Sequence, residues 1–368
     1  MKVKNNILLI SNMYPSKKYP HYGVFVKNTS SILMNNGYKV KVVAMNKVNR
    51  PTKKLFAYIR LYVLTIFHGL FGNFNIIYAH YASHTALPLL FINKIRKIPI
   101  VMNVHGNDVV PETKKDLKYQ GLVKRVLSCA DSIICPSEYF ERELITRYGV
   151  NENKITIYPS GGVDTTKYVE IDRQFARDRM KLPPNMVLIG YVGRIEQNKG
   201  WDLFLDACKE IVDVVPNCRF VVVGDGTQIS AYNEKVNQYG LNKYIFKFDF
   251  LSQEELVYIY NALNIFVFST HRKSESLGLV GLEAMACGTI CVLPDEYGPS
   301  SYGKDNINAF VFRTNSLKSL IDTILEGIKY QGSLIQQNAR KTALTYDSKR
   351  TEKILINLFN YLVENLPQ

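Results

Sequence analysis

Short apolar runs alternate with longer segments of helical periodicity through the first half of the chain. Apolar, β-branched runs of about four to eight residues are typical of buried strands, and apolar positions three or four residues apart are typical of helices. Strands are predicted at residues 7–10, 40–44, 75–78, 98–104 and 132–136, and helices at 24–36, 85–94, 118–129 and 138–148. This alternation predicts a doubly wound parallel sheet.

The alternation is interrupted and then starts again, which indicates a second domain. Residues 165–185 are charged and contain prolines, so we expect a linker there. Further strands are predicted at 187–192, 220–223, 265–268 and 290–293, and helices at 201–214, 254–262, from about 279 to 288, 317–329 and 347–364. A chain of 368 residues is long enough for two separate cores. We therefore predict an α/β fold with two Rossmann-like doubly wound domains.

Residues 53–72 do not fit this alternation, because they are apolar on almost every face. A helix that is apolar all round is usually buried in a core. Aromatic side chains beside basic ones also suit a membrane interface. Both interpretations stay open, and the candidate membrane contacts are Lys53, Lys54 and Arg60, beside Phe56, Tyr58 and Tyr62.

Composition excludes some classes of protein. No window holds 18 uncharged apolar residues, and no cleavage pattern precedes the first predicted strand, so we expect neither a transmembrane helix nor a signal peptide. The six cysteines form no Cys-x-x-Cys pair and lie mostly in apolar runs. They are typical of reduced core residues in a cytosolic protein.

The net positive charge is confined to the first half of the chain. Residues 1–170 contain 24 Lys and Arg against 10 Asp and Glu, and residues 1–107 contain no acidic residue at all. A basic protein can simply be soluble, or can bind nucleic acid. Confinement to one half favours a partner that meets this half alone, and we expect an anionic membrane surface rather than nucleic acid.

The stretch from Ser274 to Thr289 carries the most specific chemistry. It follows an apolar strand and places Gly278 just before a helix that begins near Leu279 or Val280. Free N–H groups at a helix start receive anions such as a diphosphate, and a glycine lets the anion approach the backbone. Glu275 and Glu283 flank this point and can accept hydrogen bonds from sugar hydroxyls. Alternatively, the stretch is an ordinary crossover with a solvated Glu275.

Two basic residues follow another predicted strand end. Gly193 and Arg194 come directly after strand 187–192, and Lys199 precedes the next helix. Two fixed cations there can neutralise a leaving diphosphate, although either can be a plain surface charge. A dehydrogenase Rossmann motif is excluded, because the Gly-x-Gly-x-x-Gly spacing is absent.

The first half offers two further candidates at strand ends. Gly23 precedes the first helix, where it permits a tight turn, and His105 follows strand 98–104. Open α/β sheets bind ligands at the carboxyl ends of their strands. Asp108 either orients His105 or caps the following turn, and the sequence leaves both roles open.

Together these motifs resemble the retaining GT-B glycosyltransferases of family GT4. The resemblance rests on Glu275 and Glu283 with seven residues between them around Gly-Leu-Val, on Gly-Arg and Lys-Gly within 193–200, and on His-Gly-x-Asp at 105–108. It implies a GT-B fold whose two domains face each other across a donor-binding cleft. The implied domains are 1–168, joined by a C-terminal helix of about 350–368, for the acceptor, and 169–349 for the nucleotide-sugar donor.

The resemblance also implies a role for each candidate residue. His105, Arg194, Lys199 and Glu275 are the expected catalytic residues, with His105 and Glu275 contacting the donor sugar. Glu283 is expected to hold the ribose. The expected donor-binding residues are Gly23, Gly193, Gly278, Leu279, Val280 and Glu283.

The implied activity is retaining transfer of a hexose-type sugar from a nucleoside-diphosphate sugar, with UDP the expected nucleotide. The acceptor is a glycan or a lipid-linked molecule in synthesis of a bacterial-type surface polysaccharide or glycolipid. No Asp-x-Asp triple occurs, so we expect no metal and no other cofactor. We expect a cytoplasmic protein, peripheral at the inner face of the membrane. A nucleotide-sugar epimerase, a glycan phosphorylase and a non-catalytic glycan- or lipid-binding subunit remain alternatives.

Overall fold

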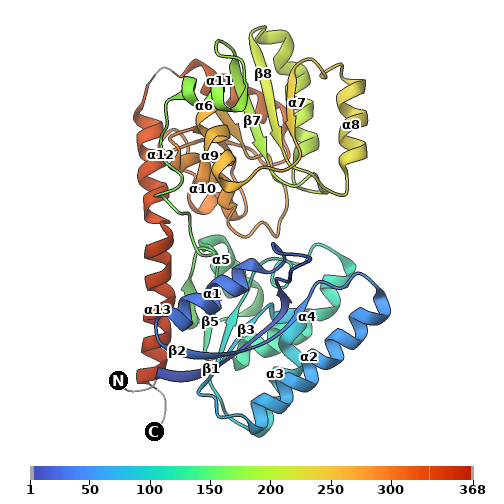
Figure 1. The fold of residues 1–368 in the computed structure, drawn as a ribbon, viewed down its shortest axis with the longest axis vertical. Coiled ribbons are helices and arrows are strands. Elements are labelled where there is room, and N and C mark those ends of the chain that lie inside the picture. Colours follow the sequence, from blue (N-terminus) through green and yellow to red (C-terminus); the bar gives the residue numbers. More distant parts are fainter. Residues whose placement is uncertain (1–3, 331, 366–368) are drawn as a thin grey trace. The chain divides into compact units, whose positions relative to one another are not determined.

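The computed structural model describes residues 4–330 and 332–365 and divides the chain into two compact units (Figure 1). The first unit comprises residues up to 161 and those from 351 onward, and the second comprises residues 162–350. Each unit contains one six-stranded sheet in which all the paired strands run parallel.

The first unit is a doubly wound sheet with helices on both faces. Its strands lie in the order β2 (Tyr38–Asn46), β1 (Lys4–Tyr14), β3 (Ile76–His80), β4 (Ile100–Asn103), β5 (Ser132–Cys135) and β6 (Ile155–Ile157). One face is covered by α2 (Pro51–Phe71), α3 (Ala82–Ile95), α4 (Lys114–Cys129) and α5 (Glu138–Tyr148). The other face is covered by α1 (Val24–Asn35) and α13 (Ser348–Glu364). The strand order reverses between β1 and β3.

The second unit repeats this plan. Its strands lie in the order β12 (Phe310–Phe312), β11 (Ile290–Pro294), β10 (Ile265–Val267), β7 (Val187–Val192), β8 (Cys218–Val223) and β9 (Ile245–Phe248). One core holds side chains of α7 (Trp201–Val214), α8 (Ile229–Gln238) and α11 (Leu317–Lys329). The other holds side chains of α6 (Arg173–Met180), α9 (Gln253–Ala262), α10 (Leu279–Ala286) and α12 (Leu334–Thr345). Short 3₁₀ turns occupy Glu152–Lys154 and Gly298–Ser301.

Continuous apolar runs form the central strands, as parallel sheets covered on both faces require. All four side chains of residues 7–10 in β1 are fully buried, and so is every residue of β3. Alternate side chains of these strands point to opposite faces. Leu8 and Ile10 therefore pack under α2 and α3, whereas Ile7 and Leu9 pack under α1 and α13.

The structure corrects the domain boundary and the linker. The first unit ends at Gly161 rather than at residue 168, because Val163 pairs with Asp347 and Tyr168 joins a core of the second unit. Residues 165–185 are not a plain linker, since they contain α6. The buried Arg177 of α6 donates hydrogen bonds to the Ala262 carbonyl and to Asn264.

The segment 53–72, whose burial the sequence left open, forms most of helix α2. Core packing accounts for only one side of it, where Leu61, Thr65 and Gly69 are buried. Six large apolar side chains of α2 are between 49% and 76% exposed. By length and composition alone α2 is also able to cross a membrane, contrary to expectation, although core helices of soluble proteins pass the same test.

Candidate functional site

The second unit brings together two loops that are far apart in sequence. Lys199 lies in the loop after β7, and Glu275 lies in the loop after β10. These strands are neighbours although β8 and β9 separate them along the chain, so the strand order reverses between them. Open α/β sheets bind ligands outside the carboxyl ends of strands at such a point.

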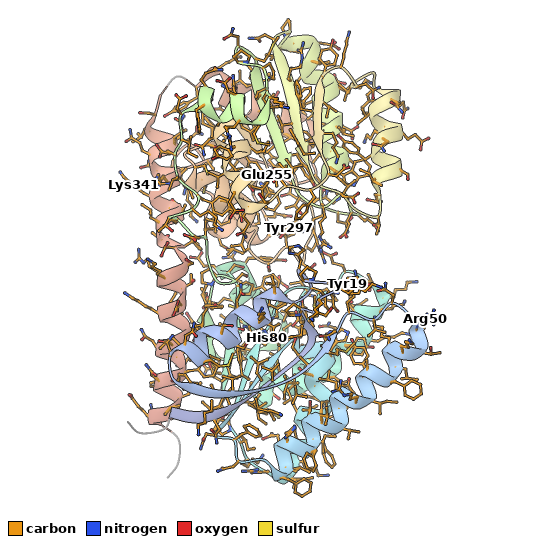
Figure 2. All side chains as sticks on the ribbon, in the orientation of Figure 1. Tyr19, Arg50, His80, Glu255, Tyr297 and Lys341 are labelled. Atoms are coloured by element: carbon orange, nitrogen blue, oxygen red, sulfur yellow. The ribbon has the colours of Figure 1, made fainter. Side chains whose placement is uncertain are left out.

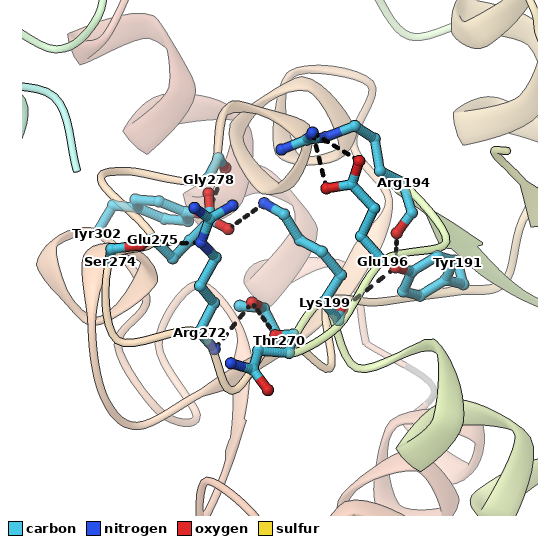
Figure 3. A network of polar contacts seen from close by, with 11 residues as sticks. Tyr191, Arg194, Glu196, Lys199, Thr270, Arg272, Ser274, Glu275, Gly278 and Tyr302 are labelled. Carbon is cyan, nitrogen blue, oxygen red and sulfur yellow. Dashed lines mark hydrogen bonds and ion pairs between the residues drawn. The ribbon is translucent and has the colours of Figure 1, made fainter. Parts of the chain in front are cut away.

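Lys199 and Glu275 form a close ion pair there (Figure 3). The Lys199 Nζ lies 2.6 Å from Glu275 Oε2, and the side chains are only 15% and 12% exposed. Burial opposes ionisation of the Glu275 carboxyl. The Lys199 ammonium outweighs it, with help from Arg272 and Arg194, and lowers the pKa of Glu275 below its usual value. The Glu275 carboxyl therefore stays ionised at neutral pH.

A buried tyrosine holds the Lys199 loop in place. The Tyr191 hydroxyl lies 3.2 Å from the carbonyl oxygens of both Arg194 and Lys199, so its proton is shared between two acceptors. The Ser269 hydroxyl also donates to the Gly200 carbonyl at 2.7 Å and ties this loop to the one after β10. The sequence analysis missed Tyr191, whose only signal is a hydroxyl within an otherwise apolar strand.

The other basic side chains of the site are less buried. Arg194 pairs with Glu196 at 2.7 Å, and its side chain is 60% exposed. A guanidinium this exposed can turn toward an anion. Arg272, which the sequence analysis also missed, donates from Nε to the Ser274 hydroxyl at 2.9 Å and helps to lower the pKa of Glu275. Its signal was the His-Arg-Lys run at 271–273, in the loop that follows β10.

Helix α10 begins beside this ion pair. Its N-cap is Gly278, with φ of 80°, and a Cβ there would overlap the ring of Phe268. No side chain caps the helix, so the first turn from Leu279 and Val280 presents its backbone N–H groups. The Tyr302 hydroxyl donates to the Gly278 carbonyl at 2.9 Å and fixes the start of the helix.

Glu283 lies one turn into α10 and has a different environment from Glu275. Burial raises the pKa of Glu283, which has no cation partner among the ion pairs of the described chain. The Tyr260 hydroxyl donates to Glu283 Oε2 at 2.8 Å and opposes that rise. Glu275 is thus the ionised partner of Lys199, whereas Glu283 is a hydrogen-bond acceptor for Tyr260.

In the first unit, His105 belongs to a buried ring cluster. His80 ends β3, and its Nδ1 lies 2.9 Å from Nε2 of His105, with the rings stacked at 5.1 Å. Phe25 and Tyr81 cover His105 with ring centroids 4.7 Å and 4.8 Å away. Figure 2 shows His80 inside the first unit. Sequence reasoning missed it, although a histidine at the end of an apolar strand was a signal.

Burial keeps both imidazoles neutral. It lowers the pKa of His105 to about 3, and burial together with the nearby His105 lowers the pKa of His80 well below its usual value. Two neutral rings at this distance must share one N–H, which one ring donates to the bare nitrogen of the other. His80 therefore orients His105.

Asp108 does not orient the imidazole. Its carboxylate accepts hydrogen bonds from the backbone N–H groups of Ala82, His105 and Gly106 at 2.9–3.2 Å. Of the two roles left open, the geometry supports the backbone cap. It holds the loop after β4 against the start of α3.

Gly23 and the basic residues of α2 occupy separate places in the first unit. Gly23 is the N-cap of α1, with φ of 72°, and a Cβ there would lie 2.7 Å from the backbone of Met13. Lys53, Lys54 and Arg60 are exposed on α2. Their roles, like those of the donor-site residues, remain predictions.

Gly193 follows β7 directly, where its N–H donates to the Val223 carbonyl at 2.9 Å. A Cβ there would lie 2.9 Å from the Tyr191 hydroxyl. A side chain would therefore displace the hydroxyl that holds the Lys199 loop.

Two other features bear on ligand binding, namely the side chains available to a metal ion and a cavity in the second unit. Within residues 4–330 and 332–365, no group of three His, Cys, Asp or Glu side chains is arranged to hold a metal ion. A cavity of about 310 Å³ is lined in part by Leu263, Gly288 and Thr289. These residues precede β10 and β11, so the cavity lies at the amino ends of the strands and is separate from the Lys199–Glu275 pair.

Two protein-family models match the chain. The family described as Glycosyltransferase Family 4 matches residues 15–167, and the family described as Glycosyl transferases group 1 matches residues 172–342. The chain belongs to the GT4 glycosyltransferases. The first match includes Gly23 and His105, and the second includes Lys199 and both glutamates.

Curated relatives are similar over part of their length. The chain is 25% identical over 267 residues to the D-inositol 3-phosphate glycosyltransferase of Nocardia farcinica, covering 69% of this chain and 58% of that protein. It is 29% identical over 248 residues to the capsular polysaccharide biosynthesis glycosyltransferase CapM of Staphylococcus aureus, covering 62% of each. The chain thus spans about three fifths of the length of these relatives.

Solved structures share the fold across almost the whole chain. Sucrose-phosphate synthase from Thermosynechococcus elongatus matches with a TM-score of 0.80 and 17% identity, covering 98% of this chain and all of that one. Anabaena HepE in complex with UDP and glucose matches with a TM-score of 0.72 and 16% identity, covering 97% and 100%. These structural neighbours are GT-B glycosyltransferases, and they confirm the predicted GT-B architecture.

Proposed function

We propose that this protein is a retaining glycosyltransferase that moves a hexose-type sugar from a nucleoside-diphosphate sugar to a glycan or lipid-linked acceptor. The observation that carries the proposal is the buried Lys199–Glu275 ion pair beside the uncapped start of α10. It joins a cation, an ionised carboxylate and a set of backbone N–H groups at the point where strand order reverses. These groups match the charges and hydroxyls of a sugar diphosphate.

The leaving diphosphate meets cations and N–H groups in this proposal. Lys199 and Arg194 neutralise the charge that develops on the phosphate oxygen, and Arg272 adds a third positive charge nearby. The backbone of Gly193 and Gly278 and the N–H groups of Leu279 and Val280 hold the phosphates. A helix start contributes about 0.3–2 kcal/mol toward an anion, so the cations supply most of the stabilisation. No metal or other cofactor is required.

The two glutamates divide the rest of the donor between them. Glu283 accepts hydrogen bonds from the ribose hydroxyls, since a carboxylate that Tyr260 and Tyr168 hold in place keeps further lone pairs for a diol. Glu275 accepts from the sugar hydroxyls, and Lys199 keeps it ionised for that purpose. His105 contacts the donor sugar as a neutral imidazole, and Gly23 leaves room for the diphosphate.

The reaction retains configuration by attack on the same face as the departing group. The bond between the anomeric carbon and the phosphate oxygen breaks as the acceptor oxygen bonds to that carbon. The acceptor proton passes to the leaving phosphate oxygen, so no protein carboxylate needs to act as nucleophile. The resemblance to the family supports this route, and the carboxylate proposed to contact the sugar, Glu275, is paired with Lys199.

UDP is the proposed nucleotide, and surface polysaccharide or glycolipid synthesis is the proposed setting. Support comes from the UDP bound by HepE and from the polysaccharide role in the name of CapM. We place the protein in the cytoplasm at the inner face of the membrane, where its basic first unit meets anionic lipid and a lipid-linked acceptor.

A panel of UDP- and GDP-sugars tests the activity. The purified protein should release a nucleoside diphosphate from one donor, and EDTA should leave the rate largely unchanged. Interconversion of the sugar without any acceptor would replace the proposal with an epimerase. A requirement for inorganic phosphate would indicate a phosphorylase. Absence of nucleotide binding across the panel would favour a non-catalytic subunit, and an absolute need for Mn²⁺ or Mg²⁺ would overturn the metal-free mechanism.

A further inference from the structure

Helix α2 presents an apolar stripe away from the core. Every fourth residue from Leu55 to Phe71 is a large apolar side chain that is between 49% and 76% exposed: Leu55, Ile59, Val63, Phe67 and Phe71. The buried residues Leu61, Thr65 and Gly69 are also four apart but offset by two positions, so they lie on the opposite side of the helix. Figure 2 shows side chains projecting outward along α2 from Arg50 at its start.

Helix α3 continues this surface. Its exposed apolar residues Leu87, Phe91 and Ile95 are again four apart and are between 47% and 61% exposed. The two helices pack side by side on one face of the first sheet (Figure 1). The exposed sides of both therefore face away from that sheet. We define the α2–α3 apolar face as Leu55, Phe56, Ile59, Val63, Phe67, Phe71, Leu87, Phe91 and Ile95.

The attachment of α2 to the first unit argues against a membrane-spanning helix. A Cβ at Gly69 would overlap Ile92 of α3, so the two helices touch closely there. The Arg96 guanidinium donates to the carbonyls of Leu70 and Gly72 at 3.2 Å and 2.6 Å. Leu61 packs in the same core as Leu8 and Ile10 of β1. Removing α2 to span a bilayer would expose this core, whereas lying on a surface keeps it intact.

Basic residues surround this apolar face. They are exposed at the start of α2, at the end of α3 and along α4, which packs beside α3. We define the basic margin as Lys53, Lys54, Arg60, Lys94, Lys97, Lys114, Lys115, Lys118, Lys124 and Arg125. Residues 1–107 include no acidic side chain. A large exposed apolar patch with a polar rim marks a site of interaction.

We propose that the α2–α3 apolar face enters the headgroup region of an anionic lipid bilayer, with the basic margin contacting the lipid phosphates. The proposal rests on the proposed function, because it names the surface through which the enzyme reaches a lipid-linked acceptor. Apolar side chains that enter the interface and cations that remain at phosphate level are the two parts of peripheral membrane binding.

Charge complementarity selects the bilayer over a second copy of the chain. In a symmetric pair the same patch meets itself. Basic margins would then be brought together around the apolar contact, and like charges repel. An anionic surface meets the same apolar residues while neutralising the margin.

The sequence analysis grouped Phe56, Tyr58 and Tyr62 beside the candidate membrane contacts, and the structure separates them. Tyr58 and Tyr62 are partly buried against the core of the first unit, and the Tyr58 hydroxyl accepts a hydrogen bond from Asn12. Phe56 is 70% exposed. Phe56 therefore belongs to the membrane contact, and the two tyrosines do not.

Co-sedimentation with vesicles tests the proposal. Wild-type protein should bind vesicles made of equal parts phosphatidylcholine and phosphatidylglycerol at low salt, and bind pure phosphatidylcholine far more weakly. Raising salt to about 1 M shortens the screening length to ~3 Å, so binding to the anionic vesicles should fall. Binding that ignores both lipid charge and salt, or no binding at all, would overturn the proposal.

Two triple variants separate the two parts of the surface. Ile59, Val63 and Phe67 changed to Ser should lower the partition coefficient at least about tenfold. Lys53, Lys54 and Arg60 changed to Ser should lower it about a hundredfold at low salt. The positions are exposed, so circular dichroism should stay that of the wild type.

Matched changes on the second unit serve as controls. Val214, Leu334 and Leu344 are exposed apolar residues, and Lys318, Lys341 and Lys349 are exposed lysines. Changing either set to Ser should leave vesicle binding unchanged. If the control sets weaken binding as much as the α2 sets, non-specific hydrophobic adsorption or net charge explains the binding. The assignment of this face then fails.

Two further measurements keep the outcomes distinct. Gel filtration should show that the wild type and the apolar triple have the same oligomeric state. A wild-type dimer that the triple converts to a monomer would assign the face to a second copy. UDP binding by calorimetry in solution should be equal in all variants. Vesicle binding without UDP binding would leave the membrane face standing while the proposed function fails.

Discussion

At the scale of single residues, the Lys199–Glu275 pair is the most demanding feature of the second unit. A buried ion pair costs desolvation of both charges, so removing one partner leaves an uncompensated charge. Lys199→Ala should reduce kcat about 10²–10³-fold, because it removes a cation from the leaving phosphate. It should also raise the pKa of Glu275, since burial then acts on that carboxyl without its main counter-charge.

Initial rates with a saturating donor measure this change, with Lys341→Ala as the control. Lys341 is an exposed lysine on α12 of the same unit. The control should keep wild-type kcat and KM. A Lys199→Ala enzyme within a few-fold of wild-type kcat and with unchanged circular dichroism would contradict the role assigned to this lysine.

The His80–His105 pair predicts a pH-dependent stability. Both imidazoles are neutral in the folded protein, and the pKa of His105 is lowered to about 3, whereas an unfolded histidine titrates near 6.5. The unfolded state therefore binds more protons as pH falls below 6.5. Each histidine should cost roughly 1.4 kcal/mol of unfolding free energy per pH unit in that range, fully recovered above pH 6.5.

Urea unfolding at pH 7 and pH 5 measures this loss. His80→Gln removes one titrating ring while keeping a side chain that can donate to His105. The variant should lose less stability between the two pH values than the wild type does. Equal losses in both proteins would show that His80 does not titrate as its burial requires.

Residue types in the sequence predicted which side chains lie at the strand ends, but not which of them touch. Arg194 and Lys199 were predicted as a pair of cations, yet only Lys199 meets Glu275, while Arg194 turns to Glu196. Contacts of this kind depend on the path of each loop. That path is set by hydrogen bonds such as those of Tyr191, which no spacing in the sequence expresses.

At the scale of elements, Glu283 within α10 and Glu275 in the loop before it should respond differently to substitution. Glu283→Gln should weaken binding of free UDP, because the ribose is present without any sugar. Glu275→Gln should leave UDP affinity near wild type and reduce turnover with the full donor. The amide keeps the shape of each side chain while removing its charge. Circular dichroism checks that Glu275→Gln, which leaves Lys199 without its partner, is still folded.

Calorimetry with UDP, followed by rates with the donor, separates the two roles. Equal loss of UDP affinity in both variants would show that the roles are wrongly divided. Unchanged UDP affinity in Glu283→Gln would contradict a ribose contact.

Element prediction succeeded where apolar runs were long and failed where they were short. Strands β7 and β8 were found because apolar residues predominate in both. Strands β6, β9 and β12, at sheet edges and three or four residues each, were missed, because a run that short resembles a loop. Helix α2 was placed correctly, but its burial was left open, because periodicity cannot distinguish a face that meets a core from one that meets a membrane.

At the scale of the whole molecule, the sequence predicted two similar halves because the strand–helix alternation starts twice. It placed the boundary seven residues late, since the pairing of Val163 with Asp347 joins segments far apart in the chain. The return of the C-terminal helix to the first unit came from the family resemblance alone. Its amphipathic pattern predicts a helix but not the sheet that the helix covers.

The last prediction concerns this returning helix. Leu355 and Phe359 of α13 are fully buried in a core of the first unit, where the Phe359 ring packs against Tyr78 at 5.1 Å and Tyr38 at 6.0 Å. Phe359→Ala should lower the unfolding free energy of the first unit by about 3–5 kcal/mol. Tyr361→Ala, on the same helix but 63% exposed, should change it by less than about 0.5 kcal/mol.

Urea unfolding followed by circular dichroism measures both variants, and calorimetry with UDP shows whether the effect stays within one unit. UDP affinity should be unchanged, because Lys199, Glu275 and Glu283 all belong to the second unit. If Phe359→Ala and Tyr361→Ala proved equally mild, α13 would not complete the first core. If Phe359→Ala abolished UDP binding under conditions where Tyr361→Ala did not, the two units would not hold their structures independently.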